Sequence, residues 1–330
     1  MKKFIAKIIF FTMFCLTMVS IPAYFVDPYN VFHWKNIRDN GVEPNKNYIK
    51  TKYIVNNPTK FDGFIFGSSR VGAIHVENIK DYHIYNMTYS AGTPNEHLRT
   101  LRTFIEEGVK MEIVCIGVDS LSYTEDSREH EKQALRCSYQ HLQNPINFFL
   151  KYFDVAMIKQ SIPVIKQKLR VENVEVFYEY GAGLPYVIIP KADWENELPF
   201  IGNAQLLEET LQDIREIKQL CDENEIKLII FTNPLCEVTY RESVNRNYLV
   251  FLKELANITE YYNFSGLNNI ALDADNFYDT SHYNAFVGDM IISAIFEDEV
   301  DETLYEQGFG WYVTSDNINE LLELLQEKSK

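Results

Sequence analysis

Short apolar segments alternate with amphipathic segments from residue 60 onward, and this alternation is the strongest constraint on the fold. Strands are predicted at residues 61–66, 83–87, 112–118 and 226–232. Helices are predicted around residues 98–105, 207–221, 244–256 and 284–297. Strands that read as continuous apolar runs between helices are typical of a parallel sheet covered on both faces. We therefore expect the α/β class, with a three-layer sandwich around a mostly parallel central sheet.

Residues 120–205 interrupt this alternation with a segment that is rich in aromatic residues, including Phe148, Tyr152, Phe177, Tyr178, Tyr186 and Trp194. A loop of this length without structure of its own is unusual, so we expect a helical insertion. Most of its aromatic side chains are expected to pack, and a few to bind a sugar or polymer. The expected organisation is an N-terminal segment (1–26), a juxtamembrane segment (27–59), the main domain (60–300) and a packed acidic C-terminal helix (301–330).

The segment from residue 8 to residue 26 contains 19 residues without a charge and follows Lys2, Lys3 and Lys7. Nineteen helical residues span about 28 Å, close to the thickness of the bilayer core, and leading lysines favour a cytoplasmic N-terminus. We expect a single-pass membrane anchor with the following domain outside the cytoplasm, at the cell surface or in the periplasm. A cleaved secretory signal is the alternative interpretation, although signal peptides have shorter apolar cores.

The chain carries 31 basic and 47 acidic residues, a net charge of −16. This balance argues against binding of nucleic acid, which requires a basic face. The first 26 residues contain three lysines and no acids, so the remainder is more acidic than the whole. An acidic domain favours a neutral or weakly charged polymer substrate over a strongly anionic one.

The cysteines outside the N-terminal segment, Cys115, Cys137, Cys221 and Cys236, show no C-x-x-C spacing. No histidine lies near them at the intervals of a zinc site, so no metal site is expected. The sequence also points to no cofactor. A disulfide among the four is open, since the sequence does not select partners.

The first predicted strand ends in Gly67-Ser68-Ser69-Arg70, at the edge where open α/β sheets bind ligands. A serine at such a turn has two uses, as a nucleophile or as the cap of the next helix. The tetrapeptide alone does not decide between them.

A second polar motif, Asp279-Thr280-Ser281-His282, stands before the last long helix of the main domain. An aspartate three residues before a histidine can accept the Nδ1–H bond and leave Nε2 to act as a base toward a serine. A serine after the first strand and this pair after the last would meet at one sheet edge, with the geometry of acyl transfer.

These motifs resemble the SGNH (GDSL-like) hydrolase superfamily, whose fold is of the flavodoxin-like type. The resemblance implies that Ser69 is the nucleophile, with Ser68 at the position of the family's aspartate, and that Asp279 and His282 complete a triad. It further implies that the Ser69 and Gly92 amides bind the oxyanion. Asp119 stands where the family has the asparagine whose side-chain amide holds the oxyanion, and a carboxylate there would repel developing negative charge unless it is protonated.

Two further residues are expected at the same edge of the sheet. Arg70 either orients a substrate or pairs with an acidic neighbour. Asn233 follows the strand at 226–232 and either lines the site or only forms the Asn-Pro turn.

The apolar N-terminus, Val26-Asp27-Pro28-Tyr29, Gly-Ser-Ser-Arg and Asp-x-x-His-Tyr together resemble proteins of bacterial envelope acylation, of the alginate O-acetylation and teichoic acid D-alanylation types. The resemblance implies a serine esterase or acyltransferase acting on an envelope polysaccharide, beside a membrane-bound O-acyltransferase. The alternative is a non-catalytic accessory protein that binds the polymer or the acyltransferase.

Overall fold

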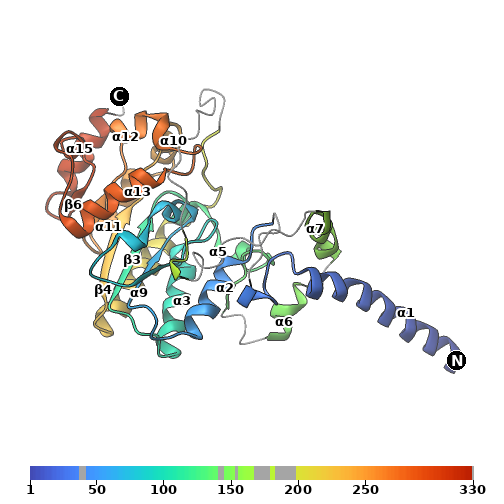
Figure 1. Cartoon of the computed structure of the whole chain (residues 1–330). Helices are drawn as coiled ribbons and strands as arrows, with labels where there is room; N and C mark the ends of the chain where they lie inside the picture. The colour runs from blue at the N-terminus through green and yellow to red at the C-terminus, as the bar shows by residue number, and fades with distance from the viewer. Residues whose placement is uncertain (37–41, 140–144, 153–154, 167–178, 183–197, 329–330) are drawn as a thin grey trace. The chain divides into compact units, whose positions relative to one another are not determined.

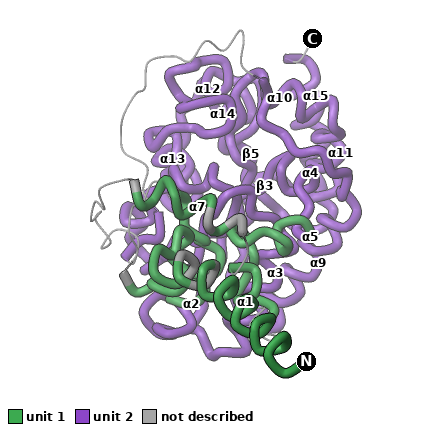
Figure 2. The backbone as a smooth tube through the Cα atoms, turned by 90° about the vertical axis from the view of Figure 1, so that its right-hand side faces the viewer, with its two compact units in different colours: residues 1–53, 128–175 green, residues 54–127, 176–330 purple. Residues whose placement is uncertain are grey.

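The computed structural model describes residues 1–36, 42–139, 145–152, 155–166, 179–182 and 198–328. Two compact units are defined by contacts within the chain (Figure 2): residues 1–53 with 128–175, and residues 54–127 with 176–330. The α-helices of the described residues are α1 (Lys2–Ile21), α2 (Lys46–Val55), α3 (Pro94–Glu106), α4 (Leu121–Thr124), α5 (Ser127–His130), α6 (Pro145–Leu150), α7 (Val155–Lys166), α9 (Leu207–Glu223), α10 (Glu237–Asn245), α11 (Tyr248–Ala256), α12 (Asn269–Leu272), α13 (Ala285–Ile292), α14 (Glu302–Tyr305) and α15 (Ile318–Lys328).

A six-stranded sheet forms the centre of the second unit (Figure 1). Its strands are β1 (Gly63–Phe66), β2 (Ile84–Asn86), β3 (Ile113–Val118), β4 (Lys227–Thr232), β5 (Tyr261–Asn263) and β6 (Trp311–Val313). The order is β2-β1-β3-β4-β5-β6, and β6 alone among these pairs antiparallel to its neighbour. The expected α/β class with a mostly parallel sheet is confirmed.

Both faces of the sheet are buried, which explains the continuous apolar character of its strands. Phe64 and Phe66 of β1 point to one face, where both rings lie near Phe104 of α3. Ile65 of the same strand points to the opposite face and belongs to a core cluster with Val287 of α13. Alternate residues of one strand thus serve two apolar cores, as expected for a sheet between helices.

Four strands predicted from the sequence are present within one or two residues of their expected bounds, but β5 and β6 were missed. Each has only three residues, and Tyr-Tyr-Asn and Trp-Tyr-Val give no apolar run long enough to read as a strand. They extend the sheet beyond β4, the last strand that the sequence predicts.

The helix predicted at 244–256 is present as α11, but it begins at Tyr248, four residues later than predicted. Helix α10 ends at Asn245 and α11 starts at Tyr248, because Asn247 has a left-handed backbone with φ of +67°. Such a conformation cannot continue a right-handed helix, and asparagine is among the few residues that adopt it readily. The prediction at 284–297 also changes, since α13 ends at Ile292 and continues as a π-helical turn, Ser293–Glu297.

The uncharged N-terminal segment is helical, comprising α1 and a π-helical turn at Pro22–Val26. Within the described part of the chain, no helix combines the length and hydropathy needed to cross a membrane. The expected transmembrane helix at residues 8–26 is therefore not supported.

Aromatic residues of the expected insertion pack inside the first unit. Phe148 stacks on Tyr48 with ring centroids 4.7 Å apart, and the Tyr152 hydroxyl accepts a hydrogen bond from Asn45 Nδ2 at 2.9 Å. Phe148 and Tyr152 are fully buried. These two residues therefore have the packing role expected for most of the group, whereas Phe177, Tyr178, Tyr186 and Trp194 lie outside the described residues.

A close approach of α13 to the segment after β1 determines the distance between the two motifs. The segment after β1 forms a short 3₁₀-helix, η3 (Ser69–Ala73), and Gly288 of α13 lies against the Ala73 carbonyl. A Cβ on Gly288 would overlap this backbone oxygen, which no side-chain rotation relieves. Only glycine allows this contact.

We expect Gly288→Ala to lower the free energy of unfolding by about 1–3 kcal/mol, because α13 must move away from η3. Chemical denaturation measures this change. Gly72→Ala is the matched control, since a Cβ at Gly72 of η3 would lie 3.6 Å from its nearest neighbour, an ordinary contact. Equal stability of Gly288→Ala and the wild type would contradict the packing argument.

Candidate active site

The first motif occupies the turn between β1 and η3. Gly67 has φ of +158°, and a Cβ there would overlap the Val71 side chain, so the tight turn requires glycine. The Ser68 carbonyl accepts hydrogen bonds from Val71 N–H at 3.1 Å and from Thr88 Oγ1 at 2.6 Å. These contacts fix the backbone of the turn, so that Ser69 begins η3 with its side chain partly exposed.

The second motif is a turn that the Asp279 carboxylate organises. Its Oδ1 accepts hydrogen bonds from the Ser281 amide at 2.7 Å and the His282 amide at 2.8 Å. The Tyr278 amide donates to the His282 carbonyl at 2.8 Å and closes the turn. Asn284 then caps α13 by accepting a hydrogen bond from the Val287 amide.

The structure brings Ser69, His282 and Asp279 together. Ser69 Oγ lies 2.8 Å from His282 Nε2, and His282 Nδ1 lies 2.9 Å from both Asp279 carboxylate oxygens. An ionised carboxylate only accepts hydrogen bonds, so Nδ1 carries the proton and donates it to Asp279. Nε2 is then the acceptor for the Ser69 hydroxyl, which is the arrangement of a nucleophile, a base and an orienting acid.

The electrostatics keep Asp279 ionised in this arrangement. Partial burial alone would raise the pKa of Asp279, but the hydrogen bond and charge interaction with His282 and the two backbone amides outweigh it and lower this pKa. The carboxylate therefore remains available to hold His282 under mildly acidic conditions.

Arg70 and Asp119 form a buried ion pair beside this triad. The Arg70 guanidinium donates to Asp119 Oδ1, and neither residue is more than 1% exposed. Asp119 also accepts hydrogen bonds from the Leu121 amide and from Asn233 Nδ2, each at 2.8 Å. The charge of Asp119 is thus balanced by Arg70, whereas this carboxylate cannot act as the oxyanion donor that the family's asparagine would be.

Asn233 has a structural role besides the turn that its sequence suggested. Its amide nitrogen binds Asp119, and its Oδ1 accepts a hydrogen bond from the Tyr283 hydroxyl at 3.3 Å. Asn233 therefore connects the ends of β3 and β4 to the residue after His282.

Of the two alternatives for Arg70, pairing with an acidic neighbour is the one that the contacts show.

The loop that contains Gly92, which is expected to supply an oxyanion donor, lies against the turn that carries Ser69. A Cβ on Gly92 would contact the Gly67 carbonyl, and Ala91 has a left-handed backbone with φ of +55°. The Gly92 amide makes a long contact of 3.4 Å with the Tyr89 carbonyl. Gly92 is thus close to the turn that carries Ser69, whereas its role as an oxyanion donor remains a prediction.

Two side chains that hold the site, Asn86 and Thr239, were not predicted from the sequence. Asn86 Nδ2 donates to the Val71 carbonyl at 2.9 Å and thereby fixes η3. Thr239 Oγ1 donates to the Thr280 carbonyl at 2.6 Å and fixes the second turn. No local sequence pattern marks either residue, because each side chain binds a carbonyl that lies more than ten residues away in the sequence.

The buried Ser68 hydroxyl has no hydrogen-bond partner among the described residues. In contrast, the Ser69 hydroxyl is hydrogen-bonded to His282 Nε2. The two adjacent serines therefore have different surroundings, and Ser69 is the one in position to react.

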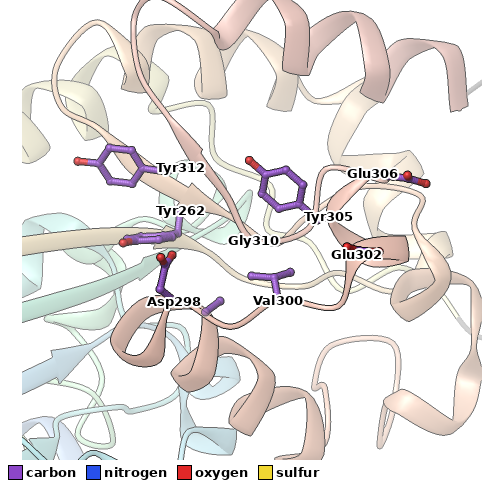
Figure 3. Close-up of a pocket in the computed structure, with 9 residues that line it drawn as sticks. Tyr262, Asp298, Val300, Glu302, Tyr305, Glu306, Gly310 and Tyr312 are labelled. Atoms are coloured by element: carbon purple, nitrogen blue, oxygen red, sulfur yellow. The ribbon is translucent and has the colours of Figure 1, made fainter.

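A pocket of about 740 Å³ outside this region is lined by residues of β5, β6 and the segment around α14 (Figure 3). It contains Tyr262, Tyr305 and Tyr312 but none of the predicted site residues.

Among the described residues, no cluster of three or more His, Cys, Asp or Glu side chains is arranged to hold a metal ion. All five cysteines are free.

His97, on α3 beside Gly92, is buried and has no hydrogen-bond partner for Nδ1 within the described structure. Burial lowers the pKa of His97 from 6.5 to about 3. The unfolded chain therefore binds a proton that the folded protein excludes between these two pH values. This difference destabilises the folded state progressively as the pH falls from about 6.5 toward 3.

We expect His97→Leu to remove this dependence, so that its stability relative to the wild type rises by about 1 kcal/mol per pH unit below pH 6.5. Denaturant titrations at a series of pH values measure this difference. Leu101→Ala, at a buried apolar residue of the same helix, is the control, because it removes no titratable group and should lower the stability by the same amount at every pH. Parallel curves for His97→Leu and the wild type would show that His97 is not excluded from protonation.

Comparison with known proteins finds no matching family model and no significant match among curated proteins. The function of the site is therefore argued from its own geometry.

Proposed function

We propose that the protein is a serine esterase or acyltransferase with the three-layer architecture of the SGNH type. The observation that carries this proposal is the continuous hydrogen-bonded chain from Ser69 through His282 to Asp279 at the carboxyl edge of a parallel sheet. Ligands of open α/β sheets bind at this edge. His282 and Asp279 are partly exposed, with 27% and 50% of their side chains accessible, so an ester can approach them.

The chemistry follows from these positions. Ser69 Oγ attacks the ester carbonyl carbon while His282 Nε2 takes the hydroxyl proton, which gives a tetrahedral oxyanion. Collapse of this intermediate breaks the bond to the alcohol, which leaves with the proton from His282, and an acyl group remains on Ser69. Water or an acceptor hydroxyl then attacks the acyl group through the same base, which gives hydrolysis or transfer.

The Ser69 amide is the first proposed oxyanion donor, because it stands at the start of η3, where a helix leaves its amides without internal acceptors. The Gly92 amide is the second, and it has to exchange its long contact with Tyr89 for the oxyanion. Each such donor contributes about 10²–10³ in rate in characterised enzymes.

The proposed substrate class is an acylated polysaccharide or another envelope polymer, with a membrane-bound O-acyltransferase as the proposed partner. This part follows from the motif resemblance. The alternative is a non-catalytic accessory protein, and Asp119 in place of the family's asparagine favours it, because a carboxylate cannot donate a hydrogen bond to an oxyanion. The ion pair with Arg70 balances the charge of Asp119 but does not supply that donor.

We expect Ser69→Ala to abolish labelling by a fluorophosphonate and to lower hydrolysis of acetyl esters at least about a thousandfold, since it removes the nucleophile. Mass spectrometry of the labelled peptide and a spectrophotometric ester assay measure the two effects.

The neighbouring serine is the matched control for this test. Ser68→Ala should keep labelling and hydrolysis, because the buried Ser68 hydroxyl has no hydrogen-bond partner among the described residues, His282 included. Labelling of Ser69→Ala at the wild-type rate would exclude the proposed mechanism.

We further propose that the protein acts outside the cytoplasm and associates with the membrane through α1. This helix exposes apolar side chains such as Phe10 and Phe11, which are 74% and 67% accessible. Exposed apolar surface of this extent is typical of a contact with a partner or a membrane.

We expect the double variant Phe10→Glu/Phe11→Glu to lose association with neutral phosphatidylcholine vesicles, because a carboxylate is poorly accommodated by hydrocarbon. Flotation of the full-length chain measures this loss. Val250→Glu on α11, at another exposed apolar position (48% accessible), is the control and should float as the wild type does. Unchanged flotation of the double variant would contradict a role of α1 in membrane association.

A further inference from the structure

Arg70 connects the two turns that carry the triad. It follows Ser69 directly in the sequence, yet its side chain is completely buried. Its Nε donates to the Ser281 carbonyl at 2.9 Å, and one terminal nitrogen donates to the Phe200 carbonyl at 3.1 Å. The other terminal nitrogen pairs with Asp119. One guanidinium thus binds three separate segments.

The contact with Ser281 is the one that bears on catalysis. Ser281 lies between Asp279 and His282, and its carbonyl belongs to the turn that holds the imidazole. We infer that Arg70 is a positioning residue, which holds the turn of His282 at reacting distance from Ser69. This inference rests on the proposed function.

The requirement is for an arginine rather than for any cation. A guanidinium presents donors in a rigid planar fork, whereas lysine places its donors on one nitrogen at the end of a flexible chain. Lysine can retain the charge pairing with Asp119 but cannot reach Ser281 and Phe200 in the same geometry. Asp119 is itself held by Leu121 and Asn233, so it anchors the fork from the opposite side.

The turn of His282 also has ties that do not involve Arg70. Thr239 Oγ1 donates to the Thr280 carbonyl at 2.6 Å, and Thr280 Oγ1 donates to the Leu198 carbonyl at 3.0 Å. Loss of the Arg70 contact should therefore shift the turn without unfolding it. A displacement near 1 Å in a catalytic geometry costs about a hundredfold in rate.

The test compares full-length Arg70→Lys with the wild type in ester hydrolysis, fluorophosphonate labelling and the ¹⁵N NMR spectrum of the His282 imidazole. We expect kcat to fall roughly 10–100-fold with KM changed less than about threefold, because substrate binding is retained while the reacting groups are misaligned. Labelling should slow by a similar factor, and the His282 resonances should shift.

Ile217→Ala is the control for a loss of stability alone, since Ile217 is fully buried on α9, which carries none of the triad. It should keep the wild-type kcat and the wild-type His282 spectrum. Wild-type kcat and spectrum in Arg70→Lys would overturn the inference, and so would equal effects in Ile217→Ala at a matched unfolding temperature.

A double variant, Arg70→Met/Asp119→Asn, protects the test against misfolding because it leaves no unpaired buried charge. It should show the same loss of kcat and the same shift of the His282 resonances, and wild-type behaviour would overturn the inference.

If the wild type and Ser69→Ala hydrolyse esters equally, the proposed function fails. The His282 spectrum of Arg70→Lys still decides the positioning role in that case, since it does not depend on turnover.

Discussion

The parallel pairing of β1, β3 and β4 is the constraint on which the site depends. Phe66 of β1 lies opposite Ile116 of β3, and Val118 of β3 lies opposite Thr232 of β4. Because the three strands are parallel, the residues that follow β1, β3 and β4 lie at one edge of the sheet. Ser69 is among them. Antiparallel pairing would send alternate strand ends to opposite edges.

Arg70 and Asp119 form an ion pair at this edge of the sheet, and its burial costs free energy. Two charges lose their hydration when Arg70 and Asp119 leave water, and such pairs contribute little net stability compared with apolar residues of similar size. Full use of the remaining donors and acceptors reduces this cost, as the contacts of Asp119 with Leu121 and Asn233 show. A pair of this kind is better explained by the geometry that it imposes on its neighbours than by the stability that it adds.

The central elements of the fold were predictable because their signals are local. Apolar runs marked β1, β3 and β4, and Gly67 and the serines after it marked the end of β1. By contrast, β5 and β6 form through pairing with strands already in place, as the register of Tyr262 with Phe231 and Tyr312 shows. The helix break at Asn247 depends on one backbone angle, which composition alone does not reveal.

The proximity of the three triad residues was also predictable, since motif order and parallel topology imply a common edge. The supporting contacts were not. Asn86 acts on the Val71 carbonyl and Thr239 on that of Thr280, so each bond depends on tertiary placement. Pairing of Arg70 with an acidic neighbour was one of two alternatives, but the sequence did not identify Asp119 as the partner, because 49 residues separate the two.

If Ser69 is acylated as proposed, the accessibility of the His282 turn has a consequence for the fate of this acyl group. With half of the Asp279 side chain and a quarter of the His282 side chain in contact with solvent, bulk water reaches the base that activates the second nucleophile. Water at about 55 M competes with any acceptor hydroxyl unless the acceptor is held in place at high effective concentration. The isolated chain should therefore partition toward hydrolysis, and net transfer requires an acceptor or a partner that covers this turn during the lifetime of the acyl-enzyme.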